Sequence, residues 1–286
     1  MPQGFRGTSA MSVVINTNIP SITAARHLAA AQAGSSKSIQ KLASGNRINT
    51  AADDAAGLAV ASKMRADVAS LNQALRNVND AISMIGVYLG AADEIEKIFL
   101  RSRELATQAS NGTYTQSDIE NAQLEYRELI NNEITRIKSS TTFNSLQVAD
   151  DHLQVVFQIG AGVNDKLSLT FPSLNAGTLM NGPPGNLSQP PPMGAQYAIG
   201  KIDQGLESLN EARTKVAAVS NRLDHTASVL MRVTESTQAA LSRVQDADFA
   251  MESATLARFG VLTQAATAML AQSNQSPEYV LALLRS

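Results

Sequence analysis

The 286-residue chain contains no cysteine and no tryptophan, and aromatic residues make up only 4% of it. Without cysteine it can form neither disulfide bonds nor thiolate metal sites. Because aromatic side chains are scarce, a buried core has to be built from alanine, leucine, isoleucine, valine and methionine, which pack well between helices. These absences favour a mainly helical body.

An excess of positive charge is also missing, since the formal net charge is −2. Neutralising nucleic-acid phosphates requires a basic surface, so we expect no nucleic-acid partner. No apolar run approaches the roughly 18 to 20 residues that cross a bilayer, and we expect no membrane insertion. The first acidic residue is Asp53, and acidic side chains are therefore absent from the first part of the chain, where the basic residues are Arg6, Arg26, Lys37, Lys41 and Arg47.

Motifs of catalysis are not found either. The three histidines do not have the spacing of metal ligands. The sequence has no GxGxxG or GxxxxGK[ST] phosphate-binding loop and no GxSxG nucleophile motif. We therefore expect no catalytic, metal or cofactor site, and a protein that is not an enzyme.

Helical periodicity dominates what is present. Apolar residues recur at alternating intervals of four and three in residues 64–92, which predicts one apolar stripe along a helix. The same spacing in residues 199–244 is typical of a coiled-coil seam, which needs a partner helix along its length. The two stripes comprise Met64, Val68, Leu71, Leu75, Val78, Ile82, Ile85, Leu89 and Ala92, and Ile199, Ile202, Leu206, Leu209, Arg213, Val216, Ser220, Leu223, Ala227, Leu230, Thr234, Thr237, Leu241 and Val244.

The middle of the chain combines a shorter helix, a hairpin and a proline-rich segment. Ser117 and Glu120 form a candidate capping box for a helix over residues 118–138. Its apolar stripe comprises Ile119, Ala122, Tyr126, Ile130, Ile134 and Ile137. Alternating apolar residues in 153–159 and 167–171 predict a β-hairpin that turns at residues 160–165. Five of the nine prolines fall in residues 183–192, so we expect residues 172–195 to form an exposed loop.

Helices of weaker apolar character are predicted near both chain ends. Their small-residue stripes comprise Ile22, Ala25, Ala29, Gln32, Ser36 and Ile39, and Leu256, Phe259, Thr263, Ala266, Leu270 and Ser273. Such alanine-rich helices are marginal alone in water and have to be stabilised by packing. The order of elements is thus symmetric, and the chain is expected to run out, turn within residues 141–195 and return along itself.

The polar stretch SGNRINTAADDAAG at residues 44–57, called the joint below, separates the first weak helix from the first long one. Gly45 stands where a helix C-cap glycine is expected. Asp53 and Asp54 fall at the first turn of the next helix, where carboxylates accept hydrogen bonds from free N–H groups. Arg47 is not explained by capping, and we expect it to reach an acidic group of the returning chain within residues 245–248.

Several longer motifs resemble those of bacterial flagellins. They are VINTN at 14–18, KLASGNRINTAADDAAGLAVA at 41–61, RSRELATQASNGT at 101–113, QDADFAMESA at 245–254 and LAQSNQSPEYVLALLRS at 270–286. The resemblance covers about residues 12–171 and 196–286, in the family's order. The centre departs from the common pattern, because a short proline-rich loop stands where many flagellins carry large variable domains.

The resemblance implies a division of the chain and a way of assembly. Residues 1–11 would be an unstructured extension, and 12–43 with 252–286 an inner coiled coil that orders on assembly. Residues 44–171 and 196–251 would form the rods and hairpin of an outer layer, and 172–195 the exposed loop. An assembly seam would include Leu256, Phe259, Leu270, Leu283 and Leu284. The chain would then be exported unfolded, secreted and polymerised into the flagellar filament.

The family also implies partners beyond the chain itself, namely an export chaperone, cap and junction proteins, and the host innate immune receptor for flagellin. The residues that match the receptor-binding surface are Arg101, Arg103, Glu104, Leu105, Gln108 and Glu125. Leu100 and Ser102 depart from the more usual glutamine and valine. The same residues fit an alternative role in axial packing between subunits.

Two further functions share parts of this pattern. A hook–filament junction protein has the same terminal helices, although the ending SNQSPEYVLALLRS follows the flagellin pattern closely. A surface adhesin or carbohydrate-binding protein on the same scaffold would use residues 172–195. A flagellin with an inserted protease is opposed by the absence of HExxH and by the small insert.

Overall fold

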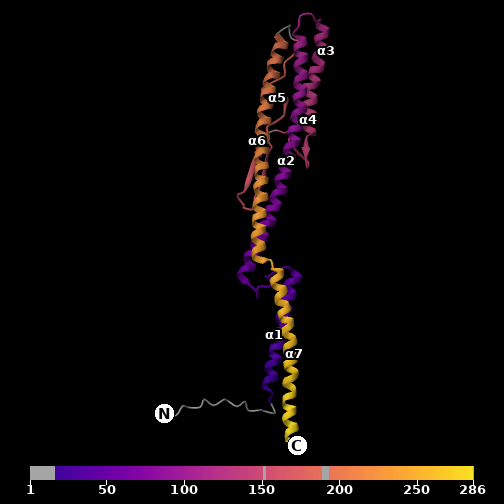
Figure 1. Cartoon of the computed structure of the whole chain (residues 1–286). Helices are drawn as coiled ribbons and strands as arrows, with labels where there is room; N and C mark the ends of the chain where they lie inside the picture. Colours follow the sequence, from indigo (N-terminus) through magenta and orange to yellow (C-terminus); the bar gives the residue numbers. More distant parts are fainter. Residues whose placement is uncertain (1–16, 151–152, 189–192, 286) are drawn as a thin grey trace, which may run out of the picture. The chain divides into compact units, whose positions relative to one another are not determined.

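The computed structural model describes the backbone of residues 17–150, 153–188 and 193–285, and side chains as far as residue 275. The fold is mainly α, with two small antiparallel hairpins, so the predicted fold class is confirmed. The helices are α1 (Ile19–Ser44), α2 (Ala55–Ala109), α3 (Gln116–Arg127), η1 (Glu128–Glu133), α4 (Ile134–Ser140), α5 (Ala176–Leu179), α6 (Met193–Gln245) and α7 (Phe249–Arg285) (Figure 1). The strands are β1 (Thr142–Phe143), β2 (Leu146–Gln147), β3 (Gln154–Gln158) and β4 (Lys166–Thr170).

The chain forms two compact units. The terminal unit comprises residues 1–64 and 239–286, and the central unit comprises residues 65–238. Within the terminal unit, α1 and α7 lie side by side (Figure 1). Within the central unit, the long α2 and α6 segments and the α3–α4 helix share one hydrophobic core (Figure 1).

The core stripe of α2 is offset from the predicted one at every second position. Leu71, Val78, Ile85 and Ala92 are buried as expected, but Leu75, Ile82 and Leu89 are only partly buried. The neighbours one residue earlier take their place in the core, namely Ala74, Ala81 and Tyr88. The intervals remain three and four, so the sequence spacing is compatible with both stripes. The buried stripe is harder to recognise because two of its members are alanines, which are only weakly hydrophobic.

The same offset occurs on α6. Ile202, Leu209, Val216 and Leu223 are buried as predicted, whereas Gly205 and Ala212 occupy the core in place of Leu206 and Arg213. Arg213 instead bridges the two long helices, because its guanidinium pairs with Asp93 at 2.5 Å and with Glu96 of α2. Small residues at these positions allow the helices to approach closely, and the larger side chains flank the seam.

A π-helical segment, η1, joins α3 to α4. The predicted stripe of this region is confirmed, since Tyr126, Ile130 and Ile134 are fully buried. These residues are spaced by four, and a wider π turn keeps such a row on one face where an α-helix would rotate it away. The capping box lies two residues earlier than predicted, because Thr115 and Asp118 exchange the reciprocal hydrogen bonds.

The predicted hairpin is present as β3 and β4, in the register that pairs Val156 with Ser168. Asn77 of α2 donates a hydrogen bond to the carbonyl of Gln158 and so fastens the hairpin to the helix, with 3.0 Å between N and O. A shorter hairpin, β1–β2, was not predicted. Its turn residues Asn144 and Ser145 both have positive φ, and the sequence lacks the glycine that normally signals such a turn.

Residues 172–188, called the strap below, do not form the exposed loop that was expected of residues 172–195. Leu174, Leu179, Met180 and Leu187 of the strap are almost completely buried in the central core. A helical turn, α5, forms within it and is capped by the side chain of Asn175. Proline and glycine limit regular structure in the strap to this short turn, but the leucines and methionine between them supply an apolar side. Residues 189–192 lie outside the described residues.

Candidate functional site

Helices α1 and α7 pack through small residues. A Cβ atom at Gly34 of α1 would lie 2.4 Å from the ring of Phe259, so the absence of a side chain makes room for this aromatic ring. Ala31 and Ser38 of α1 and Ala266 of α7 are buried in the same contact. The close approach of two small-residue faces is therefore the basis of the pair.

Polar contacts fix the register of this pair. Asn18 caps α1 by accepting a hydrogen bond from Ser21 N, and its side-chain nitrogen donates to the Ser273 carbonyl of α7 at 2.8 Å. The Ser21 hydroxyl donates to Asn274 Oδ1 at 2.7 Å. Because side-chain hydrogen bonds depend on distance and angle, they favour one register over its neighbours. The start of α1 is thereby aligned with one turn of α7.

The predicted α1 stripe faces away from α7, which corrects the sequence interpretation. Ile22 and Ile39 are 53% and 52% exposed, whereas Ala31, which lies on the opposite side of the helix from Ile22, is buried. The sequence favours the stripe that contains the two isoleucines, but Gly34 and its small neighbours face α7. The apolar face of α1 consequently remains open to solvent in the isolated chain.

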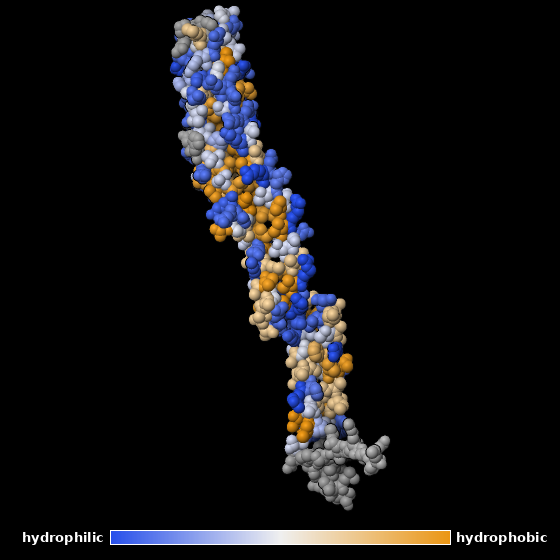
Figure 2. Space-filling model, turned by 90° about the vertical axis from the view of Figure 1, so that its left-hand side faces the viewer, coloured by the Kyte–Doolittle hydropathy of each residue, from blue (hydrophilic) through white to orange (hydrophobic). Residues whose placement is uncertain are grey.

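Helix α7 carries a similar surplus of exposed apolar side chains. The predicted seam residues Leu256, Phe259 and Leu270 are partly buried, and the predicted Leu283 and Leu284 lie outside the residues whose side chains are described. Large apolar residues outside the predicted seam are also exposed, and they are Phe249, Met251, Val261, Leu262 and Met269. Figure 2 shows orange surface over this helix pair, between smaller blue areas.

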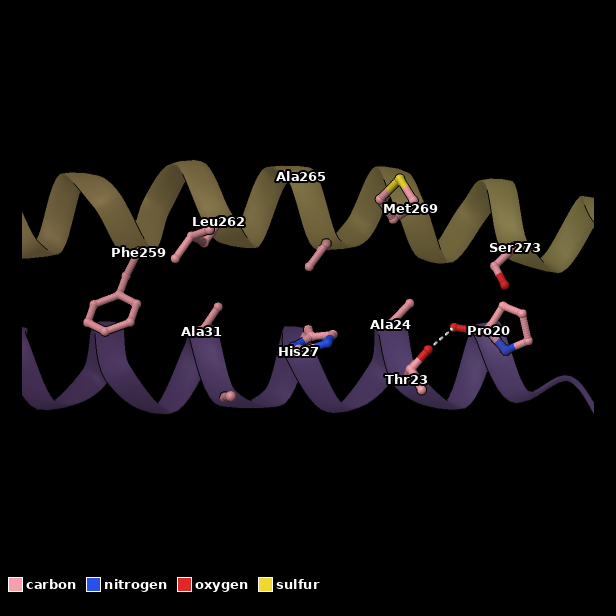
Figure 3. A pocket seen from close by; sticks show the side chains of 12 residues that line it. Pro20, Thr23, Ala24, His27, Ala31, Phe259, Leu262, Ala265, Met269 and Ser273 are labelled. Atoms are coloured by element: carbon pink, nitrogen blue, oxygen red, sulfur yellow. Dashed lines mark hydrogen bonds between the residues drawn. The ribbon is translucent and has the colours of Figure 1, made fainter. Parts of the chain in front are cut away.

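An apolar groove of about 500 Å³ runs between α1 and α7 (Figure 3). In Figure 3, Leu262, Ala265 and Met269 line it from α7, and His27 and Ala31 from α1. Among the side chains that the structure describes, no acidic one lines it, and the other lining residues are Pro20, Thr23, Ala24, Ala30, Phe259, Ala266 and Ser273. A groove of this composition suits an apolar helix face rather than a charged or strongly polar ligand.

At Gly45 the joint has the predicted structure, a helix C-cap. Gly45 ends α1 in the left-handed conformation, with φ of 70°. Asp54 caps α2, since its Oδ1 accepts a hydrogen bond from Gly57 N at 2.8 Å. Asp53 differs from the prediction, because its Oδ2 accepts from the backbone of Asn49 and Thr50 and thus closes the preceding turn.

Asp53 also pairs with a lysine of α1. Lys37 Nζ lies 2.7 Å from Asp53 Oδ1. This hydrogen bond, followed by the one from Thr50 N, holds the pKa of Asp53 well below its usual range. The carboxylate therefore remains charged in acid solution and links the turn to α1 over a wide pH range.

Arg47 reaches the returning chain, but its partner is not an acidic group. Its Nη2 donates to the carbonyl of Val244 at 2.7 Å, and its backbone N–H donates to the carbonyl of Gln245. Asn46 and Asp246 form an isolated antiparallel bridge at this point. Asp248 has a different role, as its carboxylate caps α7 by accepting from Ala250 N and Met251 N. The signal for this cap was an aspartate directly before an apolar run.

The residues that match the receptor-binding pattern fall into two groups. Arg101 donates to Glu125 of α3 at 2.9 Å and to Glu104 at 3.1 Å, and Gln108 is also exposed. Glu125 and then Glu104 raise the pKa of Arg101. Leu105, in contrast, is buried in the core of the central unit and takes no part in the surface. Arg103 extends outward to Asp203 of α6, with 2.8 Å between Nε and Oδ1.

The structure shows no alternative site with reactive chemistry among the residues that it describes. No group of three or more histidine, aspartate or glutamate side chains is arranged to hold a metal ion within these residues. Across the same described ranges, no helix combines the length and hydropathy required of a membrane span. The exposed apolar faces of the terminal helices are therefore the feature that most requires a functional explanation.

Comparisons with known proteins agree with these features. The family of the bacterial flagellin N-terminal helical region matches residues 15–152, and that of the C-terminal helical region matches residues 199–284. The chain is 40% identical to a flagellin of Halalkalibacterium halodurans, over 96% of this chain and 100% of that relative. It is 36% identical to the flagellar filament 31.3 kDa core protein of Treponema maltophilum (96% and 100%) and 34% identical to the flagellin of Bacillus subtilis (95% and 99%). With both helical regions present and relatives matched along their whole length, the chain belongs to the bacterial flagellin family.

Proposed function

We propose that this chain is a structural subunit that polymerises into a bacterial flagellar filament, and that the α1–α7 pair is its main assembly surface. The observation that carries the proposal is the set of large apolar side chains left exposed on both terminal helices. A two-helix layer cannot enclose these side chains by itself. Copies of the same pair are suited to cover them, since apolar grooves and apolar helix faces occur on one element.

The magnitude of this burial indicates a polymer rather than a dimer. Eight large apolar residues of α1 and α7 are between 43% and 70% exposed, namely Ile19, Ile22, Ile39, Phe249, Met251, Val261, Leu262 and Met269. Covering a half-exposed side chain contributes about 1 kcal/mol, so the whole set contributes roughly 8 kcal/mol. Association costs about 4 to 15 kcal/mol in lost freedom of motion. A single neighbour that covers part of the set recovers less than this cost over most of its range, whereas several neighbours in a lattice cover the whole set for one association cost.

The proposal assigns each part of the chain to a layer of the filament. Residues 12–43 and 252–286 form the inner layer of the filament, and residues 44–171 and 196–251 form the outer layer. The filament is extracellular, and the chain reaches it by export, with a chaperone and the cap and junction proteins as partners. Recognition by the innate immune receptor uses Arg101, Arg103, Glu104, Gln108 and Glu125, with Leu105 supporting the helix from within.

An adhesin that uses residues 172–195 as an exposed tip is less well supported. Leu174, Leu179, Met180 and Leu187 belong to the core of the central unit. A ligand could contact these side chains only if the strap left the core. The burial of the strap therefore favours the structural subunit.

Polymerisation of the purified full chain tests the proposal. Addition of a salt precipitant or of filament seeds is expected to give filaments by electron microscopy, while a persistently monomeric chain contradicts the proposal. Replacement of both groove residues, Leu262→Ser with Met269→Ser, removes about 2 kcal/mol of burial on assembly. This corresponds to about a 30-fold higher critical concentration.

The matched control is Val163→Ser in the turn between β3 and β4. Val163 is 81% exposed, more than either groove residue, and it lies outside the terminal helices. We expect its critical concentration to remain that of the parent. Equal effects of the groove and control variants would show that general surface hydrophobicity, and not the α1–α7 surface, determines assembly.

A further inference from the structure

Asparagine is followed by glycine at two places in the chain, Asn111–Gly112 and Asn181–Gly182. In this dipeptide the backbone nitrogen of glycine can attack the side-chain amide of asparagine. Glycine has no Cβ to shield its nitrogen and rotates easily into the required conformation. The sequence alone makes the two places equivalent, but their surroundings in the fold differ.

The first place is an open turn. Asn111 and Gly112 lie between the end of α2 and the start of α3, and both are exposed. A Cβ atom at Gly112 would meet no atom within 4 Å. Among the residues that the structure describes, no acceptor takes a hydrogen bond from Gly112 N. Within the described residues the attacking nitrogen therefore has no acceptor. The Asn111 carbonyl accepts only a long hydrogen bond, from Tyr114 N at 3.4 Å, so the peptide is weakly restrained.

The amide of Asn111 is also held beside the backbone. Thr113 N–H points to Asn111 Oδ1, with 3.4 Å between N and O. Negative charge develops on this oxygen when a nucleophile attacks the amide carbon. A backbone N–H directed at the oxygen favours that charge, although weakly at this distance.

The second place is restrained by several hydrogen bonds. Gly182 N donates to the Gly177 carbonyl at 3.0 Å, so the attacking nitrogen already has an acceptor. Lys201 Nζ donates to the carbonyls of Asn181, at 2.9 Å, and of Met180, at 3.3 Å. Rotation of the Asn181–Gly182 peptide requires these contacts to break. The surrounding strap residues are packed into the core, which opposes such a movement.

We propose that Asn111 is a site of spontaneous deamidation in the folded chain and that the fold protects Asn181. Gly112 N forms a bond to Asn111 Cγ and loses its proton, and the C–N bond of the side-chain amide breaks to release ammonia. Water then opens the resulting succinimide at either carbonyl. The products are aspartate, with the original backbone, and isoaspartate, whose backbone contains an additional methylene group. Water is the only co-reactant.

The change alters the charge of a functional surface. Each event replaces a neutral amide with a carboxylate and moves the formal net charge from −2 to −3. The new carboxylate stands shortly before the N-terminus of α3, where the helix dipole favours negative charge. The folded state is therefore expected to tolerate it. Arg101 and Gln108, which belong to the proposed receptor-contacting surface, lie on the same helix that leads into this turn.

Incubation of the purified full chain in mildly alkaline buffer, followed by peptide mapping with mass spectrometry, tests the proposal. Deamidation makes a peptide about 1 Da heavier. We expect the Asn111 peptide to change at least about tenfold faster than the Asn181 peptide, since the latter must first lose a hydrogen bond. Labelling by an isoaspartyl methyltransferase should appear in the Asn111 peptide.

Two comparisons distinguish protection by the fold from a difference in local sequence. In urea both peptides are expected to change at similar rates, and Gly112→Ala in the folded chain should slow the change at Asn111. Gly112 has space for a methyl group, so this variant should fold like the parent. Equal rates in the folded chain, or an Asn181 peptide that stays intact in urea, would overturn the proposal.

Discussion

Gly185 in the strap offers a sharp test of the packing in the central unit. A Cβ atom added at Gly185 would lie 2.7 Å from Cα and 2.9 Å from N of Ala198 in α6. These are backbone atoms of a long helix, and they cannot move aside as the end of a flexible side chain can. The Gly185→Ala variant must therefore displace the strap or distort α6.

The expected loss of stability follows from the known cost of overpacking a core. Forcing one methyl group into a filled space costs about 1 to 3 kcal/mol. The central unit spans residues 65–238. For a domain of about 150 to 250 residues, each kcal/mol lowers Tm by about 2 to 4 °C. We expect Gly185→Ala to lower Tm of this unit by roughly 2 to 12 °C.

Gly200→Ala is the matched control on the same helix. A Cβ atom at Gly200 would meet no atom within 4 Å. Alanine in a helix interior is about 1 kcal/mol more favourable than glycine, so Tm should rise by about 2 to 4 °C. The two variants add the same methyl group but are expected to shift Tm in opposite directions.

Near-ultraviolet circular dichroism is a suitable assay, because Tyr88 and Tyr126 are both completely buried in the central unit. Their signal reports tertiary packing in this unit as temperature rises. If Gly185→Ala melts at the parent temperature, the strap is not held against α6 as described. If Gly200→Ala loses as much stability as Gly185→Ala, the loss does not come from the close approach of Gly185 to Ala198.

Three further predictions concern the seam, the joint and alkaline stability. Val78→Asp should lower the free energy of unfolding by several kcal/mol more than Leu75→Asp in urea titrations, because only Val78 is fully buried. Asp53 has a lowered pKa, so its contribution to the joint is present above the ordinary value and is lost as pH falls through the lower one. Acidification should lower the protection factor of the Thr50 amide, that is, the slowing of its exchange relative to an unstructured chain at the same pH, in the parent but not in Asp53→Asn, where protection is low throughout. Burial raises the pKa of Tyr126 to about 12, so its contribution should be lost as pH rises from about 10 to 12; Tyr126→Phe should show a smaller loss in alkaline urea titrations.

The sequence predicted the elements whose apolar residues have an unambiguous period. The stripe around Tyr126 and Ile130 and the strands on both sides of residues 160–165 were identified correctly. Half of the predicted α2 stripe lies one residue away from the buried stripe. Alanine is less hydrophobic than leucine or isoleucine, so Ala74 and Ala81 give a weaker signal than Leu75 and Ile82. Periodicity identifies a helix face only to within about one residue when small and large residues alternate along it.

The candidate site was predictable in its location but not in its geometry. The weak helices at both ends pointed to a packing partner, and α1 and α7 are paired. The sequence could not show that Gly34, rather than Ile22, faces the partner, because glycine carries no hydrophobic signal. Likewise Arg47 was expected to meet a carboxylate, and its backbone acceptor at Val244 has no signature in the sequence.

The bridge between Asn46 and Asp246 also sets the effective concentration of α1 and α7 relative to each other. It lies next to the end of α1 at Ser44 and just before the start of α7 at Phe249. Two helices tethered so closely have an effective concentration in the millimolar range or above, whatever the concentration of the protein. Pairing of α1 with α7 should therefore not depend on dilution, whereas contacts between subunits should. Neighbouring subunits then need only stabilise a pair whose members are already held together.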